Sequence, residues 1–60
     1  MPMMKLTYDA EASAAYLYLS KKEIHNTITL YDQDVMINLD LDADGHAVGV
    51  EIVSMAAPAA

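Results

Sequence analysis

Apolar and polar residues alternate one by one along most of this chain, and a period of two predicts extended strands. The pattern recurs in five segments separated by polar stretches: MKLTY (4–8), AYLYLS (15–20), TITLY (27–31), VMINLDL (35–41) and AVGVEIV (47–53). No segment carries the sustained apolar stripe of an amphipathic helix. We therefore expect a mainly β fold, a small antiparallel meander of about five strands with one packed face.

The chain of 60 residues is expected to form a single domain over residues 1–60, with its core at about 4–53. Two segments leave room for a short helical turn. One is DAEASA near residues 9–14, where Asp9 can cap such a turn, although a wide loop fits equally well. The other is the alanine-rich tail at residues 54–60.

Size and cysteine content bear on how such a domain is stabilised. A chain this short buries only about 60% of the surface that its unfolded form exposes. It has no cysteine, which excludes disulfides and thiolate metal sites. No amphipathic helix is available to cover the apolar sheet face, so a second subunit is the expected cover, and a two-fold dimer is favoured. That face is expected to carry Leu17, Leu19, Ile28, Leu30, Ile37, Leu39, Val50 and Ile52.

The net charge is −6, and the only cationic side chains are Lys5, Lys21 and Lys22. Nucleic-acid binding needs clustered cations that neutralise phosphates, so this class is excluded. A basic protein is the more reasonable charged partner. The chain shows neither a secretory signal nor an apolar stretch of membrane-spanning length, so we expect no membrane association and a cytoplasmic location.

The stretch DLDADGHAVGVE (40–51) matches the twelve-residue calcium loop of an EF-hand. Asp40, Asp42 and Asp44 fall at the first three ligand positions, Gly45 at the sixth position of the loop and Glu51 at its last. The flanking segments alternate with period two, however, and an extended strand would carry Glu51 roughly 20 Å from Gly45. We therefore predict a hairpin and no metal, with Asp40, Asp42 and Asp44 as the only candidate cation ligands.

A hairpin also restricts the length of its turn, because directly paired residues face the same side of a sheet. The apolar residues are odd-numbered before the turn and even-numbered after it, so the numbers of two paired residues must add up to an odd value. A two-residue type I′ turn at Asp44–Gly45 satisfies it, and so does a four-residue loop from Asp42 to Gly45. A three-residue loop requires a bulge. The two-residue turn predicts the pairs Leu41–Val48, Leu39–Val50 and Ile37–Ile52.

Three tyrosines are candidates for an interaction surface. Tyr16, Tyr18 and Tyr31 are expected on the outer face with Thr27 and Thr29. Exposed aromatic side chains can supply binding energy to a ligand or a partner, and they can also be ordinary cross-strand pairs. We favour a subunit interface, because an aromatic group on so small a sheet makes an exposed apolar patch.

Asp9 and Glu11 lie two residues apart, as a carboxylate pair in a hydrolase might. Capping and turn formation explain them more simply, and they are kept as interaction-surface candidates. His25 and His46 fall in predicted turns and are expected to be solvated rather than metal-bound. Ser20 has no evident base beside it. We therefore expect no catalytic residue, no cofactor and no enzyme.

Together these segments resemble the YuzE-like family of small bacterial proteins, a domain of unknown function with family number 2283. The resemblance covers about residues 4–53 and departs at Ala10, where the family commonly has proline, and in the short C-terminal tail. It implies a small β-rich fold with no established activity. The matching positions are Tyr8, Asp9, Glu11, Ala12, Ala15, Tyr16, Asp40, Asp44, Gly45, Gly49, Glu51 and Ile52.

The expected function is that of a non-enzymatic, self-associating or protein-binding module. The resemblance adds an alternative, an antitoxin-like inhibitor of a basic toxin, because some such proteins are encoded near small toxin-like proteins. Two further alternatives come from the residues themselves. One is a ligand-binding protein or hydrolase that uses Asp9, Glu11 and the tyrosines; the other is a divalent-cation binder at the Asp40–Asp44 turn.

Overall fold

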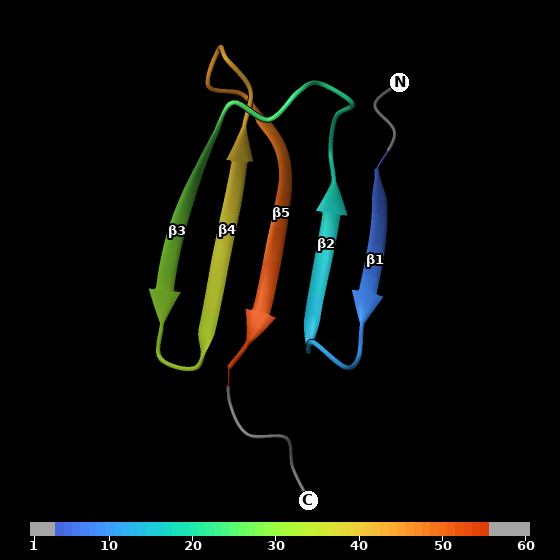
Figure 1. Ribbon diagram of the computed structural model, residues 1–60, viewed down its shortest axis with the longest axis vertical. Helices are drawn as coiled ribbons and strands as arrows, with labels where there is room; N and C mark the ends of the chain where they lie inside the picture. Colours follow the sequence, from blue (N-terminus) through green and yellow to red (C-terminus); the bar gives the residue numbers. More distant parts are fainter. Residues whose placement is uncertain (1–3, 56–60) are drawn as a thin grey trace, which may run out of the picture.

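Five strands form one antiparallel sheet in the computed structural model, which describes residues 4–55 (Figure 1). No helix occurs among these residues, so the predicted mainly β, antiparallel fold is confirmed. The fourth strand coincides with the predicted segment, and the others differ from their segments by one or two residues at an end. The strands are β1 (Lys5–Asp9), β2 (Ala14–Tyr18), β3 (Asn26–Asp32), β4 (Val35–Leu41) and β5 (Ala47–Ser54).

The strands lie in the order β1-β2-β5-β4-β3, which is not the sequential order of a meander. Hairpins join β3, β4 and β5, and β5 then inserts between β2 and β4, so that β2 to β5 form a Greek key. The segment containing KKEIHN was expected to be a hairpin connection. It instead carries the chain from β2 across the end of the sheet to the far edge, about three strand spacings or 14 Å away (Figure 1).

A tight turn, rather than a helical one, joins β1 to β2. The backbone N–H groups of Glu11 and Ala12 donate to Oδ1 of Asp9, at 3.1 and 3.3 Å. Ser13 N–H donates to the carbonyl of Ala10, and Ser13 itself has a φ of 51°, which no helix continues through. The helical turn suggested for residues 9–14 is therefore not formed, although Asp9 does act as the capping residue. The other suggested helical turn was at residues 54–60, and residues 56–60 lie outside the described residues.

The turn between β4 and β5 has three residues, so the predicted two-residue turn is wrong. Gly45 N–H donates to the Asp42 carbonyl at 3.0 Å, and Asp42 N–H donates to the His46 carbonyl at 2.9 Å. Gly45 has a φ of 82°, the left-handed conformation that closes a type I turn with a bulge. The side chain of Asp42 selects this turn, because its Oδ1 accepts the N–H groups of Asp44 and His46.

The register shift that parity demands lies between Asp40 and Leu41, and Leu41 pairs with Ala47 instead of Val48. Beyond the bulge the predicted pairs Leu39–Val50 and Ile37–Ile52 are confirmed.

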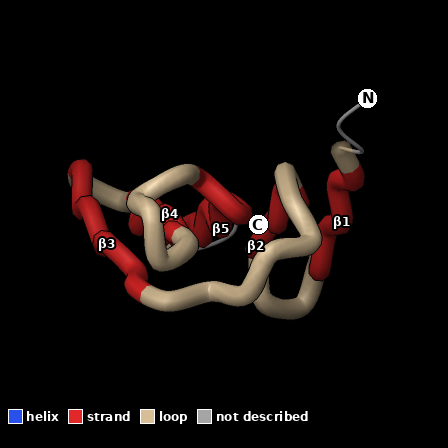
Figure 2. Tube along the Cα trace, turned by 90° about the horizontal axis from the view of Figure 1, so that it is seen from above, coloured by secondary structure: helices blue, strands red, loops and turns tan. Residues whose placement is uncertain are grey.

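The sheet has one polar and one apolar face, and the cross-strand pairs assign each residue to a side. In the described residues no second layer covers either face (Figure 2). Val48, 6% exposed, is the only buried apolar side chain in residues 4–55. The polar face carries Lys5, Thr7, Asp9, Ala14, Tyr16, Tyr18, Thr27, Thr29, Tyr31, Met36, Asn38, Asp40, Gly49, Glu51 and Val53. The apolar face carries Leu6, Tyr8, Ala15, Leu17, Asn26, Ile28, Leu30, Asp32, Val35, Ile37, Leu39, Leu41, Val50, Ile52 and Ser54.

Candidate functional site: the two faces of the sheet

A carboxylate on the central strand β4 organises the polar face. Asp40 is 9% exposed, and both of its oxygens accept hydrogen bonds. The hydroxyl of Tyr16 on β2 donates to Oδ2, and the hydroxyl of Thr27 on β3 donates to Oδ1 at 2.7 Å. The network therefore links three strands, and the two donors offset the cost of burying a charge.

Tyr16 can reach Asp40 because a glycine occupies the strand between them. Gly49 on β5 pairs with Asp40 on one side and with Tyr18 on the other. A Cβ built at Gly49 would lie 2.6 Å from Cε1 and Cζ of Tyr16. Any larger residue at this position would displace the aromatic ring, so the glycine is required by space.

The hydroxyl of Tyr16 stays protonated over an extended pH range. Burial raises the pKa of Tyr16 from 10.0 to about 12, and the hydrogen bond to Asp40 and that carboxylate's charge act in the same direction. Tyr16 is therefore a permanent donor to Asp40 at neutral pH. It is not poised to act as an acid or base.

A second polar row runs parallel to the first. Thr29 donates its hydroxyl proton to Oδ1 of Asn38 at 2.6 Å, and the amide group of Asn38 donates to Oε1 of Glu51 at 2.8 Å. In residues 4–55, every buried side-chain nitrogen and oxygen has a hydrogen-bond partner. Sequence reasoning placed Asn38 and Asp40 on the side opposite the apolar residues but did not foresee these pairings.

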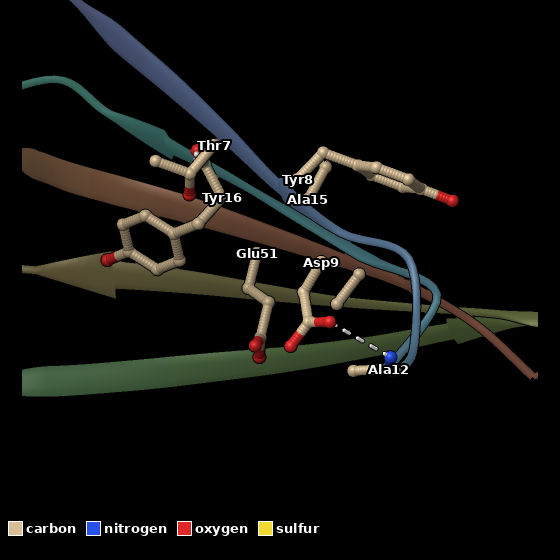
Figure 3. A pocket seen from close by; sticks show the side chains of 8 residues that line it. Thr7, Tyr8, Asp9, Ala12, Ala15, Tyr16 and Glu51 are labelled. Atoms are coloured by element: carbon tan, nitrogen blue, oxygen red, sulfur yellow. Dashed lines mark hydrogen bonds between the residues drawn. The ribbon is translucent and has the colours of Figure 1, made fainter.

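A hollow of about 220 Å³ lies on the polar face beside Tyr16. Asp9 and Glu51 both line it, and Figure 3 shows their side chains pointing to the same side of the sheet, while the ring of Tyr8 points away from them. Glu11, the predicted partner of Asp9, does not line this hollow. The residues around it are Thr7, Tyr8, Asp9, Ala12, Ala14, Ala15, Tyr16 and Glu51.

The three candidate tyrosines share the polar face as predicted but do not form one cluster. The rings of Tyr16 and Tyr18 contact each other, with centroids 4.6 Å apart, and Lys5 Nζ lies 5.9 Å from the centroid of Tyr18. Tyr31 is on β3, and two strands separate it from β2. Tyr31 therefore does not extend the contact between Tyr16 and Tyr18, and a role of the three tyrosines in an interaction surface stays a prediction.

The aspartate-rich turn is held by its own hydrogen bonds. Donation by the N–H of His46 lowers the pKa of Asp42 below its usual value of 3.8, against an opposing effect of burial. Lys22 Nζ lies 3.8 Å from the other oxygen of Asp42, a surface contact of little energetic weight. Within residues 4–55, no three histidine or acidic side chains are arranged to hold a metal ion.

The histidines do not belong to a common site. His25 ends the crossing segment, where its N–H donates to the Leu41 carbonyl at 2.8 Å. It lines a hollow of about 310 Å³ with Lys22, Glu23, Asp42, Ala43 and Asp44, and His46 is not among these residues.

The apolar face of the sheet leaves several large apolar side chains exposed. Its exposed fractions are 69% for Leu6, 70% for Tyr8, 42% for Ile28, 55% for Leu30 and 47% for Ile52. These residues come from three strands and lie on one side of a sheet whose other side carries the polar network. Monomeric domains seldom expose a contiguous apolar surface of large extent.

None of the described residues form a helix with the length and apolar character that a bilayer-spanning segment needs.

Comparison with known families places this fold and surface in context. Residues 5–55, which include all five strands, match the profile of a family described as "Protein of unknown function (DUF2283)". No curated protein and no solved structure matched significantly. The resemblance expected from the tyrosine–aspartate opening and the glycine–hydrophobic–glutamate strand is thereby confirmed, and the chain belongs to the DUF2283 family of proteins of unknown function.

Proposed function

We propose that this protein is a non-enzymatic association module, and that its apolar face binds the same face of a second copy. The observation that carries the proposal is the exposure of Leu6, Tyr8, Leu30 and Ile52 on one side of a single-layer sheet. Burying apolar side chains is the main favourable term in folding and association, and residues 4–55 form no second layer that covers them.

The available area supports a dimer. A standard protein interface buries about 800 Å² on each partner. That is about a sixth of the chain's 4778 Å² of accessible surface, which is a reasonable share for one face of a single sheet. Two such faces can pack about 10 Å apart as a β-sandwich, with side chains of the two sheets interdigitating.

The charge distribution also supports this contact. The strand carboxylates of Asp9, Asp40 and Glu51 lie on the polar face, away from the proposed contact. Among the strand residues that the pairing assigns to the apolar side, only Asp32 carries a charge, and it is the last residue of β3. Pairing the apolar faces therefore buries no central charge, and salt screens the repulsion between two subunits of net charge −6.

The non-enzymatic part of the proposal is supported by the hydrogen bonds that the acidic side chains already accept. Asp40 accepts two side-chain hydrogen bonds, Asp9 caps a turn, and Glu51 accepts from Asn38. An antitoxin-like role, ligand binding or hydrolysis at the hollow, and a cytoplasmic location stay predictions.

Sedimentation equilibrium at micromolar concentration tests the proposal. We expect Ile52→Lys, which puts a charge on the central strand of the apolar face, to weaken association at least 100-fold. The matched control is Thr7→Lys, an exposed position on the polar face, which is expected to associate as the unsubstituted protein does. Equal association constants for the two variants, or an unsubstituted chain that is monomeric and cooperatively folded, would refute the face contact.

A further inference from the structure

The strand β3 forms one edge of the sheet, and no other strand of residues 4–55 lies on its outer side (Figures 1 and 2). It pairs with β4 along all seven residues without a register shift, and every one of those residues is exposed. An edge of this length presents a row of N–H and C=O groups to whatever approaches it. One of them, the Thr27 N–H, already donates to the side-chain Oδ1 of its neighbour Asn26 at 3.0 Å, in an exposed local bond. The surface is separate from the apolar face considered above.

The hydrogen bonds at the strand ends reveal which groups point outward. Met55 N–H donates to the Asp34 carbonyl, which extends the β4–β5 ladder by one bonded pair. Bonded pairs alternate along an antiparallel ladder, so the even-numbered residues of β4 bond to β5 and the odd-numbered ones bond to β3. Ile28 and Leu30 pair with odd-numbered β4 residues and so face inward. The backbone groups of Thr27, Thr29 and Tyr31 consequently point out of the edge.

This edge lacks the devices that usually block strand addition. The segment NTITLYD contains no proline, lysine or glycine and no bulge. The opposite edge, β1, is shorter at five residues, carries Lys5, and by the same alternation directs only Leu6 and Tyr8 outward within the strand. Of the two edges, β3 is the better template for another strand.

We propose that β3 pairs antiparallel with β3 of a second copy, about a two-fold axis at Thr29. Thr29 is the middle residue of the strand, so this register overlaps all seven residues. The outward groups of Thr27, Thr29 and Tyr31 would form about six hydrogen bonds between the chains, with the Thr27 N–H exchanging its bond to Asn26 Oδ1 for one to the partner strand. The two sheets become one continuous sheet of ten strands.

The strand is complementary to itself in this register, which is why a second copy is the occupant. Ile28 lies opposite Leu30 of the partner strand, and Thr27 lies opposite Tyr31, a favourable pairing of a β-branched residue with an aromatic one. Asn26 lies opposite Asp32, so no like charges meet despite the net charge of −6. A shift by two residues would place the Asp32 carboxylate opposite Ile28 or leave Asn26 opposite Leu30.

The edge contact and the face contact are compatible. Directly paired residues face the same side, so joining two β3 strands puts both apolar faces on the same side of the larger sheet. Two such sheets can then stack through their apolar faces. The combined assembly is a tetramer with closed symmetry, four times the chain mass of 6.5 kDa.

The test uses Thr29→Pro, which removes only an outward N–H group from the backbone. Proline is tolerated at an edge when the missing N–H faces solvent, so the pairing with β4 is expected to survive. Thr29→Val is the matched control, because it also loses the hydroxyl but keeps the N–H. Native mass spectrometry and sedimentation velocity are carried out on both, on Ile52→Lys and on the Thr29→Pro/Ile52→Lys double variant, with circular dichroism to check folding.

We expect a tetramer for the unsubstituted chain and for Thr29→Val, dimers for Thr29→Pro and for Ile52→Lys, and a monomer for the double variant. If the edge contact alone exists, the unsubstituted chain and Ile52→Lys are dimers and Thr29→Pro is a monomer. If the face contact alone exists, Thr29→Pro keeps the mass of the unsubstituted chain, and the edge proposal is overturned. An unlimited rise of mass with concentration would indicate open-ended β1–β3 pairing and would also overturn it.

Amide hydrogen exchange of the unsubstituted chain keeps the proposal testable if Thr29→Pro does not fold. The N–H groups of Thr27, Thr29 and Tyr31 are expected to be protected at least tenfold in concentrated solution and to lose that protection on dilution. Rapid exchange of these three groups at all concentrations, beside slow exchange of Ile28 and Leu30, would show a free edge and contradict the pairing.

Discussion

The aromatic ring of Tyr16 lies across the α-carbon of Gly49, where a Cβ would be 2.6 Å from Cζ of the ring. The tyrosine hydroxyl thereby passes over β5 and donates to Asp40 on β4. Three strands are held in register by one side chain, and this is possible because the middle strand offers no side chain at that point. Gly49, which has no side chain, therefore determines how the polar face is organised.

Gly49→Ala is expected to destabilise the fold by about 1–3 kcal/mol, because the added methyl group overlaps the ring of Tyr16. In a Tyr16→Ala background the same change should be neutral or stabilising, since alanine orders a strand at a lower entropic cost than glycine. Urea denaturation of the four proteins in a double-mutant cycle measures the coupling. The same loss in both backgrounds would show that the ring is not the cause.

Tyr16→Phe is expected to lower the free energy of unfolding by about 1–3 kcal/mol at neutral pH, because it leaves one oxygen of the buried Asp40 carboxylate without its donor. The loss should depend on pH. Folding raises the pKa of Tyr16 from 10.0 to about 12, so its contribution is complete below pH 10 and disappears as the pH rises towards 12.

The stability difference between Tyr16→Phe and the unsubstituted chain should therefore shrink from pH 10 upward. Urea denaturation of both proteins at pH 7, 10 and 11.5 measures this difference, and the other titrating groups, common to both proteins, cancel. A difference that stays constant over this range would contradict the assigned pKa.

Asp42→Ala should destabilise the β4–β5 turn at every pH, because the N–H groups of Asp44 and His46 lose their acceptor. Asp42→Asn keeps an acceptor oxygen and removes only the charge. Since folding lowers the pKa of Asp42 below 3.8, the charge stabilises the fold above that pH and ceases to do so as the pH falls through the lowered value. Thermal melts at pH 6 and pH 3 should show that Asp42→Asn is less stable than the unsubstituted chain at pH 6 and that this difference is smaller at pH 3.

Millimolar calcium is expected to leave the melting temperature unchanged. The Asp40 and Asp42 oxygens already accept hydrogen bonds, and Glu51 lies in the middle of a strand bound to Asn38. Specific binding at 100 times the dissociation constant would add about 2.7 kcal/mol of stability. A stabilisation of that size, removed by Asp42→Ala and by Glu51→Ala alike, would restore the calcium-loop interpretation; magnesium at the same concentration is the control.

Much of the local structure could be predicted from the sequence because strand geometry is local. Successive side chains of a strand point to opposite faces, so the alternation in VMINLDL determines both that the segment is extended and that Asn38 and Asp40 oppose Ile37 and Leu39. The same alternation determines the parity of the β4–β5 pairing, which the pair Leu39–Val50 obeys, and it places the apolar residues on one face.

The turn and the candidate site were predicted less well. The length of the β4–β5 turn depends on the hydrogen bonds that the Asp42 side chain accepts from the N–H groups of its neighbours. The alternation of apolar residues alone also allowed a two-residue turn. Asp9 lines one hollow together with Glu51 of β5, whereas Glu11, the partner that the pattern suggested, is not among the lining residues.

Only the tertiary structure decided the order of the strands, and with it everything that spans them. Each strand has two edges, and alternation says which face a side chain takes but not which strand lies beside it. The insertion of β5 between β2 and β4 brings Gly49 between Tyr16 and Asp40, twenty-four residues apart in the chain, and moves Tyr31 away from the other tyrosines. It also leaves β3 at the edge, because the pairing partners of a strand are set by the summed energy of long-range contacts that no local pattern encodes.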